Sequence, residues 1–154
     1  MKKGGYAVPN VLSRVLLGFQ GRKLARCIES ELAENFLSLL LKAMGVAFFL
    51  LRDFRKNIVD FEGKYFFKSR DNGITVAAVF KDGEMTVKDT ALKDPDVTVT
   101  FKDAAKLRDF LLAPKQDILG SMLRQDITIN GNLNYLYKFA YMAKHLQLMV
   151  TGKA

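Results

Sequence analysis

The feature that most constrains the fold is a period-two pattern of apolar residues, which is typical of a β-strand with one buried face. It occurs in residues 64–70, 74–80, 85–87 and 97–101, and turn signals at residues 71–73 and 82–83 separate the first three segments. Asn and Gly in such turns tolerate the positive φ of a tight hairpin. The sequence therefore predicts an antiparallel meander of three strands, after which the connection beyond Val87 leads to the other half of the sheet.

The rest of the second half predicts a fifth strand at residues 127–129 and three helices. Asp103 is placed to cap a helix that ends before Pro114, a short helix follows at residues 116–123, and the final helix covers residues 133–150. The final helix is apolar on almost every side, which is typical of a helix buried all round. We therefore expect helices to cover the sheet.

The first third of the chain is predicted to be helical. Asn10 is a cap for a helix over residues 11–19, and apolar residues recur at helical spacing from Arg22 onward, with Gly45 expected to kink or end that helix before residues 46–51. Residues 36–51 are almost wholly apolar, but the run is shorter than a membrane-spanning helix needs and holds Lys42 near its middle. We interpret it as a buried or interface-lying helix.

Composition points to one domain with more apolar surface than a thin sheet requires. Of 154 residues, 49% are apolar, including 12 Phe, 5 Tyr and 6 Met. Pockets for apolar ligands are concave and mostly hydrophobic, so this surplus predicts a lipid-like ligand. A core filled by side chains fits the same pattern, and the sequence leaves both open.

Positive charge is concentrated near the start of the chain. The formal net charge is +8, and six basic residues precede Glu29, the first acidic one. Such a segment suits an anionic membrane surface, an acidic partner protein or nucleic acid, or is simply a solvated face. Our candidate docking residues are Arg14, Arg22, Lys23 and Arg26.

Residues that would carry catalysis are sparse. His145 is the sole histidine and Cys27 the sole cysteine, so neither a two-histidine metal site nor an internal disulfide can form. We expect His145 to be a helix-end residue and Cys27 a small apolar one. The acidic residues around Pro95 lack the spacing of a calcium loop, and the aromatic residues between Lys64 and Lys68 are expected to be core. We therefore predict no enzyme activity, no metal, no cofactor and no nucleic-acid partner.

Three motifs in the second half carry a family resemblance. They are the segments 80–87 (FKDGEMTV), 95–101 (PDVTVTF) and 127–132 (ITINGN). In this order and spacing they resemble the sterol carrier protein 2 family, and the similarity covers residues 62–148. The resemblance implies an α+β fold in which a five-stranded mixed sheet is covered by helices and holds an apolar tunnel for a lipid.

The resemblance also implies which residues line the tunnel. Carry-over by position gives seven of them, and four more apolar residues of the predicted strands and helix complete the candidate lipid-binding set. The set is Phe80, Val99, Phe101, Phe110, Met122, Leu123, Ile127, Ile129, Leu133, Leu136 and Ala140. Three neighbouring positions depart from the family pattern, which has glutamine, glycine and lysine where this chain has Arg124, Gln125 and Asp126.

The helical lead-in resembles a second group, the bacterial accessory proteins of ubiquinone biosynthesis that contain the same domain. This predicts a helical extension over residues 1–61, packed on a lipid-binding domain over residues 62–154. The expected function is to bind and carry an isoprenoid quinone precursor, a fatty acyl lipid or a sterol-like molecule. The alternative is a protein-interaction or scaffold module without a free cavity. We expect a cytoplasmic protein, with peripheral membrane association as an open possibility.

Overall fold

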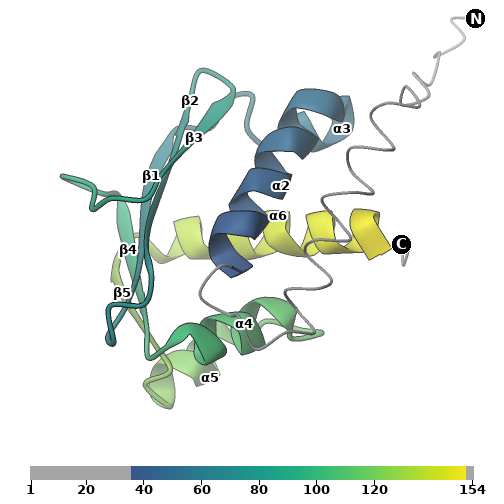
Figure 1. The fold of residues 1–154 in the computed structure, drawn as a ribbon. Coiled ribbons are helices and arrows are strands. Elements are labelled where there is room, and N and C mark those ends of the chain that lie inside the picture. Colours follow the sequence, from purple (N-terminus) through teal and green to yellow (C-terminus); the bar gives the residue numbers. More distant parts are fainter. Residues whose placement is uncertain (1–35, 152–154) are drawn as a thin grey trace, which may run out of the picture.

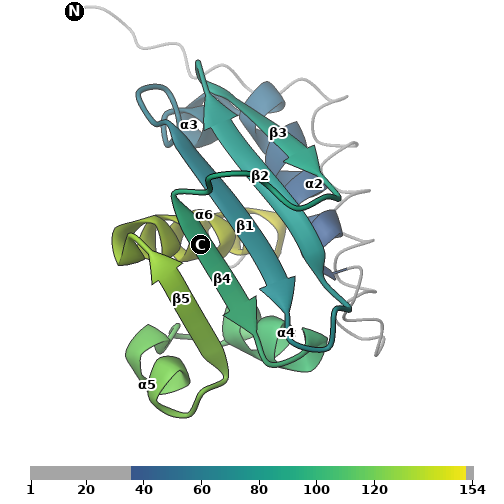
Figure 2. The same ribbon diagram turned by 90° about the vertical axis from the view of Figure 1, so that its left-hand side faces the viewer.

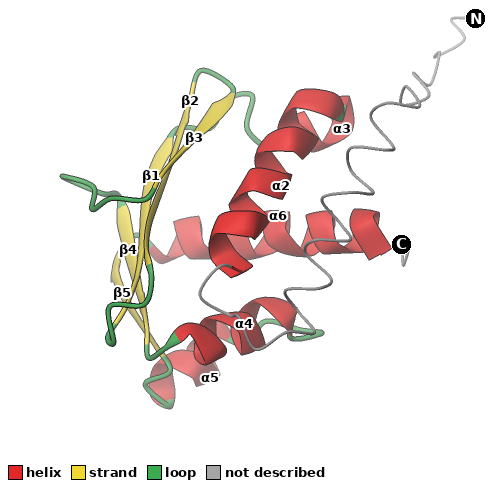
Figure 3. Ribbon diagram, viewed as in Figure 1, coloured by secondary structure: helices red, strands yellow, loops and turns green. Residues whose placement is uncertain are grey.

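A five-stranded sheet with helices on one face forms the centre of the computed structural model, which describes residues 36–151 (Figures 1 and 3). Its elements are α2 (Phe36–Leu50), α3 (Arg52–Arg55), β1 (Gly63–Ser69), β2 (Thr75–Lys81), β3 (Glu84–Lys88), β4 (Val97–Phe101), α4 (Ala104–Leu112), α5 (Ile118–Leu123), β5 (Ile127–Gly131) and α6 (Leu133–Thr151). The helix predicted at residues 11–19, the first part of the helix predicted from Arg22, and Cys27 lie outside the described residues.

The sheet is mixed, with the strand order β3-β2-β1-β4-β5 (Figure 2). Strands β1, β2 and β3 form the predicted antiparallel meander, and β5 pairs antiparallel with β4. The parallel pair is β1 with β4, because the connection after β3 carries the chain past β2 to the far side of β1. The predicted fold class, a five-stranded mixed sheet covered by helices, is confirmed.

Both predicted turns use residues that tolerate the left-handed backbone region. Asn72 has φ 61°, and Asp82 and Gly83 have φ 53° and 71°. Two consecutive positive φ values match the right-handed twist of the flanking strands, as in the favoured two-residue hairpins. Turn chemistry thus fixes the register in which β2 meets β3.

The alternation then divides the sheet into two faces. Tyr65 and Phe67 of β1, and Val97, Val99 and Phe101 of β4, are at most 1% exposed and face the helices. Figure 1 shows α2, α4 and α6 on this inner side of the sheet, and no helix of residues 36–151 on the other. Because the side-chain period of a strand is two, the intervening residues face the opposite, outer side.

Helix boundaries follow local capping, with two differences from the sequence-based expectation. The carboxylate of Asp103 accepts from the amide of Lys106 at 2.8 Å and starts α4, as predicted. Asp117 accepts from the amide of Gly120 at 2.9 Å, so α5 begins at Ile118 rather than at Gln116. Gly45 neither kinks nor ends α2, which continues to Leu50 because its apolar face is held against the core.

Helix α6 is attached to the central strand through Tyr65. Its hydroxyl donates to the carbonyl oxygen of Tyr135 at 2.8 Å, and its ring lies edge-on to those of Tyr135 and Phe80. Burial raises the pKa of the Tyr65 hydroxyl well above its ordinary value.

Within residues 36–151, no helix has the length and hydropathy needed to cross a membrane.

Gly131, at the end of β5, occupies a position that only glycine fits. Its φ is 110°, and a Cβ atom there would collide with the backbone oxygen of Asp96 on the neighbouring segment. Gly83 also has a positive φ, but a Cβ atom there would meet nothing within 4 Å. A side chain at Gly83 would therefore meet only backbone strain, whereas a side chain at Gly131 would meet both strain and a steric collision.

We expect Gly131→Ala to lower the free energy of unfolding by more than about 2 kcal/mol, because strain and a backbone collision add. Gly83→Ala is the matched control and should cost only the left-handed strain, about 1–2 kcal/mol. Urea denaturation of both variants measures the difference. Equal losses would contradict the collision at Gly131.

Candidate functional site

An apolar layer lies between the inner face of the sheet and the helices. The sheet contributes the large rings of Tyr65, Phe67, Phe80 and Phe101, each at most 1% exposed. The helices contribute further fully buried side chains, namely Phe36, Leu40 and Met44 from α2, Leu107 from α4, and Phe139 and Met142 from α6. Only an apolar molecule or more apolar side chains fit such a layer, because a polar group without a partner is costly there.

The structure brings together nine of the eleven predicted lipid-binding residues. Six are buried in the layer, namely Phe80, Val99, Phe101, Phe110, Ile127 and Leu136, whereas Ala140 is buried on α6 outside this cluster. Three are half-buried against it, namely Met122, Ile129 and Leu133. Leu123 does not join them, since its side chain is 77% exposed on α5.

Sequence reasoning left residues of β1 and α2 out of this set. Tyr65 and Phe67 had a usable signal, because the aromatic residues between Lys64 and Lys68 were expected to be core. Phe66 was included in that expectation but is only half-buried. Helix α2 falls within the predicted N-terminal extension, yet Phe36 and Met44 are fully buried in the same core as the sheet residues. Helical periodicity shows which face of α2 is apolar but not what that face covers.

A hollow of about 180 Å³ leads from the surface toward the layer, between the end of α2 and the β2–β3 turn. It is lined by Gly45, Phe48, Phe49, Arg55, Gly83, Glu84 and Met85. The ring of Phe48 forms its deep wall and stacks on Phe54 at 4.6 Å, with Phe80 edge-on at 6.2 Å. The Phe49 side chain stands beside the hollow, 83% exposed. We call this hollow the α2–hairpin opening.

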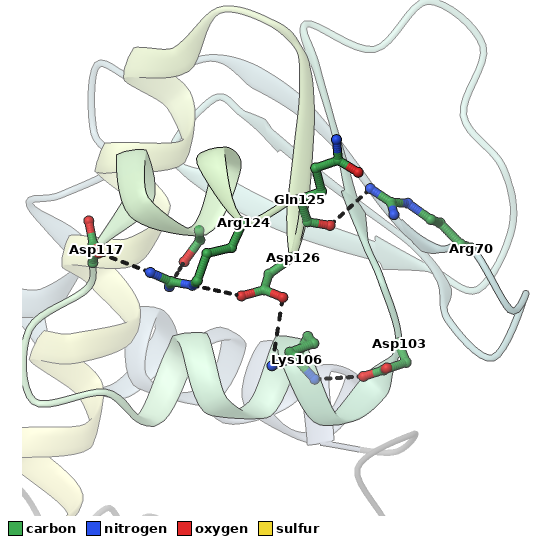
Figure 4. A network of polar contacts seen from close by, with 8 residues as sticks. Arg70, Asp103, Lys106, Asp117, Arg124, Gln125 and Asp126 are labelled. Carbon is green, nitrogen blue, oxygen red and sulfur yellow. Dashed lines mark hydrogen bonds and ion pairs between the residues drawn. The ribbon is translucent and has the colours of Figure 1, made fainter.

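A second hollow, of about 200 Å³, lies between α4 and α5 and is charged. Arg124 binds Asp126 (Nε to Oδ2, 3.1 Å) and lies 3.6 Å from Asp117, while Lys106 approaches Asp126 from α4 at 3.6 Å (Figure 4). The hydrogen bond from Arg124 lowers the pKa of the Asp126 carboxyl. This network fastens α5 to α4 and β5, and its charges do not suit an apolar ligand.

Gln125, which stands where the family pattern has glycine, adopts a left-handed backbone conformation at the end of α5. Its φ is 58°, and the amides of Gln125 and Asp126 donate to the carbonyls of Met122 and Ser121 at 3.0 and 2.9 Å. This is a Schellman turn, whose left-handed position usually holds glycine. Arg70 supports the turn by donating from Nη2 to the Gln125 carbonyl at 3.0 Å (Figure 4). The same Nη2 donates to the Thr128 hydroxyl, also at 3.0 Å.

We expect Gln125→Gly to raise the free energy of unfolding by about 0.5–1 kcal/mol. Relief of left-handed strain outweighs the entropy that glycine adds to the unfolded chain. Gln125→Ala keeps the strain, loses only the exposed side chain, and should change little. Thermal unfolding of the three proteins checks this, and destabilisation by glycine would show that the side chain itself holds the turn.

His145 does not form a catalytic arrangement in the described structure. It lies inside α6, more than a turn before the helix ends, so the expected helix-end position is wrong. Its Nδ1 is buried without a hydrogen-bond partner, and the ring contacts Phe54 at 5.3 Å and Tyr141 at 6.0 Å between centroids. Among residues 36–151, no three His, Cys, Asp or Glu side chains gather as metal ligands would.

Comparison with known proteins identifies the fold. No protein-family model matches the sequence, and no curated protein matches it either. The solved sterol carrier protein domain 2 of Helicoverpa armigera is similar, with a TM-score of 0.51 and 20% identity over 74% of this chain and 88% of that one. The described structure therefore has the sterol carrier protein 2 fold, as the sequence motifs predict.

Two other solved structures align with the chain. A double mutant of the sec-alkyl sulfatase PisA1 gives a TM-score of 0.58 and 17% identity over 73% of this chain, but the match spans only 17% of the sulfatase. A structure described as a UbiJ-SCP2 ubiquinone synthesis protein gives a TM-score of 0.49 and 17% identity, covering 62% of this chain and 79% of that one. The sulfatase match is thus to one part of a longer protein, and the last alignment adds nothing to the fold assignment.

Proposed function

We propose that this protein binds and carries a lipid-like molecule in the apolar layer between its sheet and its helices, without catalysis. The observation that supports this most directly is the layer itself, walled by aromatic and aliphatic side chains from β1, β2, β4, α2, α4 and α6. A ligand there would gain about 25 cal/mol for each Å² of apolar surface removed from water, before the costs of association. The sterol carrier protein 2 fold agrees with this role.

The α2–hairpin opening is our proposed entrance. Its lining is apolar on the inner side, where Phe48 and Met85 lie, and charged only at the rim, where Arg55 and Glu84 lie. Methionine side chains adapt to irregular shapes, so Met85 and the buried Met44 can rearrange around an entering chain. An isoprenoid quinone precursor, a fatty acyl lipid or a sterol-like molecule would enter tail first.

A second candidate function is a scaffold module whose interior is already filled. The rings of Tyr65, Phe67, Phe80, Phe101 and Phe139 are nearly inaccessible to solvent, which favours close packing. The two hollows described, of about 200 and 180 Å³, are also smaller than the roughly 300–1,000 Å³ of most ligand pockets. A lipid that enters through either of these two hollows must expand it, whereas a scaffold leaves the interior unchanged.

The variant Gly45→Leu distinguishes a lipid carrier from a scaffold module, because it narrows the proposed entrance. A Cβ atom at Gly45 meets only the methyl end of Met85, at 3.7 Å, so the leucine fits but narrows the opening. Leucine in place of glycine also strengthens the helix by about 0.8–1 kcal/mol. We expect a protein at least as stable as the original whose affinity for a fluorescent fatty acid falls about tenfold, a loss of roughly 1.4 kcal/mol.

Ala105→Leu, on the exposed side of α4, is the matched control for Gly45→Leu and should bind the fluorescent fatty acid as the original chain does.

Native mass spectrometry of the purified original chain, followed by solvent extraction, identifies any lipid that it retains. A carrier retains stoichiometric lipid. Reproducible absence of lipid together with no fatty-acid binding would favour the scaffold.

We also propose that the basic N-terminal segment docks the protein on an anionic membrane. Its candidate residues Arg14, Arg22, Lys23 and Arg26 lie outside the described structure, and the proposal rests on the six basic residues that precede Glu29. Each basic residue near an anionic surface contributes up to about 1 kcal/mol, which salt partly screens. The expected attachment is reversible.

Liposome co-sedimentation tests this docking. The intact chain should pellet more with anionic than with neutral vesicles. Changing Arg14, Arg22, Lys23 and Arg26 to glutamine should remove that preference, because it removes four of the six early charges. Equal pelleting with both vesicle types, or full retention by the variant, would show that these charges dock nothing.

A further inference from the structure

The outer face of the sheet has no helix over it in the described structure. Figure 2 looks directly onto this face, with all the labelled helices behind it. Its central residues are Lys64, Phe66 and Lys68 of β1, which lie opposite Val79, Ala77 and Thr75 of β2. On the other side of β1, Phe66 and Lys68 lie opposite Thr98 and Thr100 of β4. The surface is made mostly of lysine and threonine.

Cations outnumber anions on this face. By strand alternation it presents six basic residues, namely Lys64, Lys68, Arg70, Lys81, Lys88 and Lys102, and all six are exposed. Four acidic residues share this face: the exposed Glu62 directly precedes β1, Glu84 lies opposite Lys81, Asp96 accepts from the backbone amide of Lys64 at 2.8 Å, and the fourth is Asp126. Asp126, at the edge, is already paired with Lys106 and Arg124.

The basic residues are not neutralised within the described chain. Its five ion pairs use Lys56, Lys106, Arg108 and Arg124 as cations, and none of these belongs to the outer face. Adjacent strands lie about 4.8 Å apart, so Lys88 of β3 lies about 10 Å across the sheet from the strand that carries Lys64 and Lys68. A partner with carboxylates at several points would meet all three lysines.

Among residues 36–151, none of the exposed large apolar side chains lies on the outer face of the sheet. They are Phe49, Val59, Leu119, Leu123, Tyr137, Tyr141, Leu148 and Met149, and all belong to the helices or to the α3–β1 connection. The outer face therefore offers a bilayer no apolar anchor. Its one aromatic residue, Phe66, is half-buried, whereas surfaces that bind single-stranded nucleic acid stack successive bases on several aromatics.

We propose that the outer face of the sheet is the docking surface for an acidic protein partner. Carboxylates of that partner pair with Lys64, Lys68 and Lys88, and the threonine hydroxyls between them donate further hydrogen bonds. Such charge complementarity steers association and sets orientation. This goes beyond the proposed function, because lipid binding uses the opposite, inner face and leaves the outer face free.

Fluorescein-labelled poly-L-glutamate is the probe, measured by fluorescence anisotropy with the full chain at low and at physiological ionic strength. The test variant changes Lys64, Lys68 and Lys88 to glutamine. The control variant removes the same charge from exposed sites on the helical side, by changing Lys42, Arg52 and Lys115 to glutamine. Both keep the N-terminal basic segment, so only the position of the lost charge differs.

We expect the test variant to bind poly-L-glutamate about tenfold more weakly and the control variant less than about threefold more weakly. Equal losses would mean that only net charge matters and would overturn the proposal. So would a test variant that loses binding mainly to a poly-uridine oligonucleotide or to phosphatidylglycerol vesicles. Fluorescent fatty-acid binding should be unchanged in the test variant, so failure of this proposal is distinguishable from failure of lipid binding.

Discussion

Strand β1 determines the arrangement of the whole described structure. It pairs antiparallel with β2 and parallel with β4, so both halves of the sheet depend on it. Its inner residues Tyr65 and Phe67 are fully buried and contact the ring of Phe139 on α6, while the Tyr65 hydroxyl binds a backbone carbonyl of that helix. Burial of this one strand therefore fixes the sheet and the last helix together.

The sheet also separates two kinds of chemistry. Its inner face is covered by helices and is apolar apart from the buried Ser69, and its outer face is covered by none of the described helices and is rich in lysine and threonine. The separation is a direct result of the side-chain period of two, because each strand presents alternate residues to opposite sides. A lipid-binding layer and a polar docking surface can thus lie back to back across one sheet, without competing for the same side chains.

Local rules account for much of the fold. The alternation in residues 64–101 identified four strands and their buried faces, and the turn residues Asn72, Asp82 and Gly83 adopt the positive φ that their type favours. Asp103 caps the helix it was expected to cap. These features were predictable because each depends on residues close together in sequence. Nine of the eleven candidate lipid-binding residues lie in or against the apolar layer, and seven of the eleven had been carried over by position from the family resemblance.

Other features depend on contacts between distant residues. Gly45 continues α2 because the helix is packed on the core, and Leu123 is exposed because Arg124, Asp117 and Asp126 hold α5 with that side outward. The left-handed turn at Gln125 is supported by Arg70, which is far away in the chain. The sequence by itself determined the strands, the turns, the buried faces and the apolar character of the site. Only the tertiary structure decided the parallel pairing of β1 with β4, the place of α2 in the core and the uncovered basic face, because each arises from long-range packing that no local pattern records.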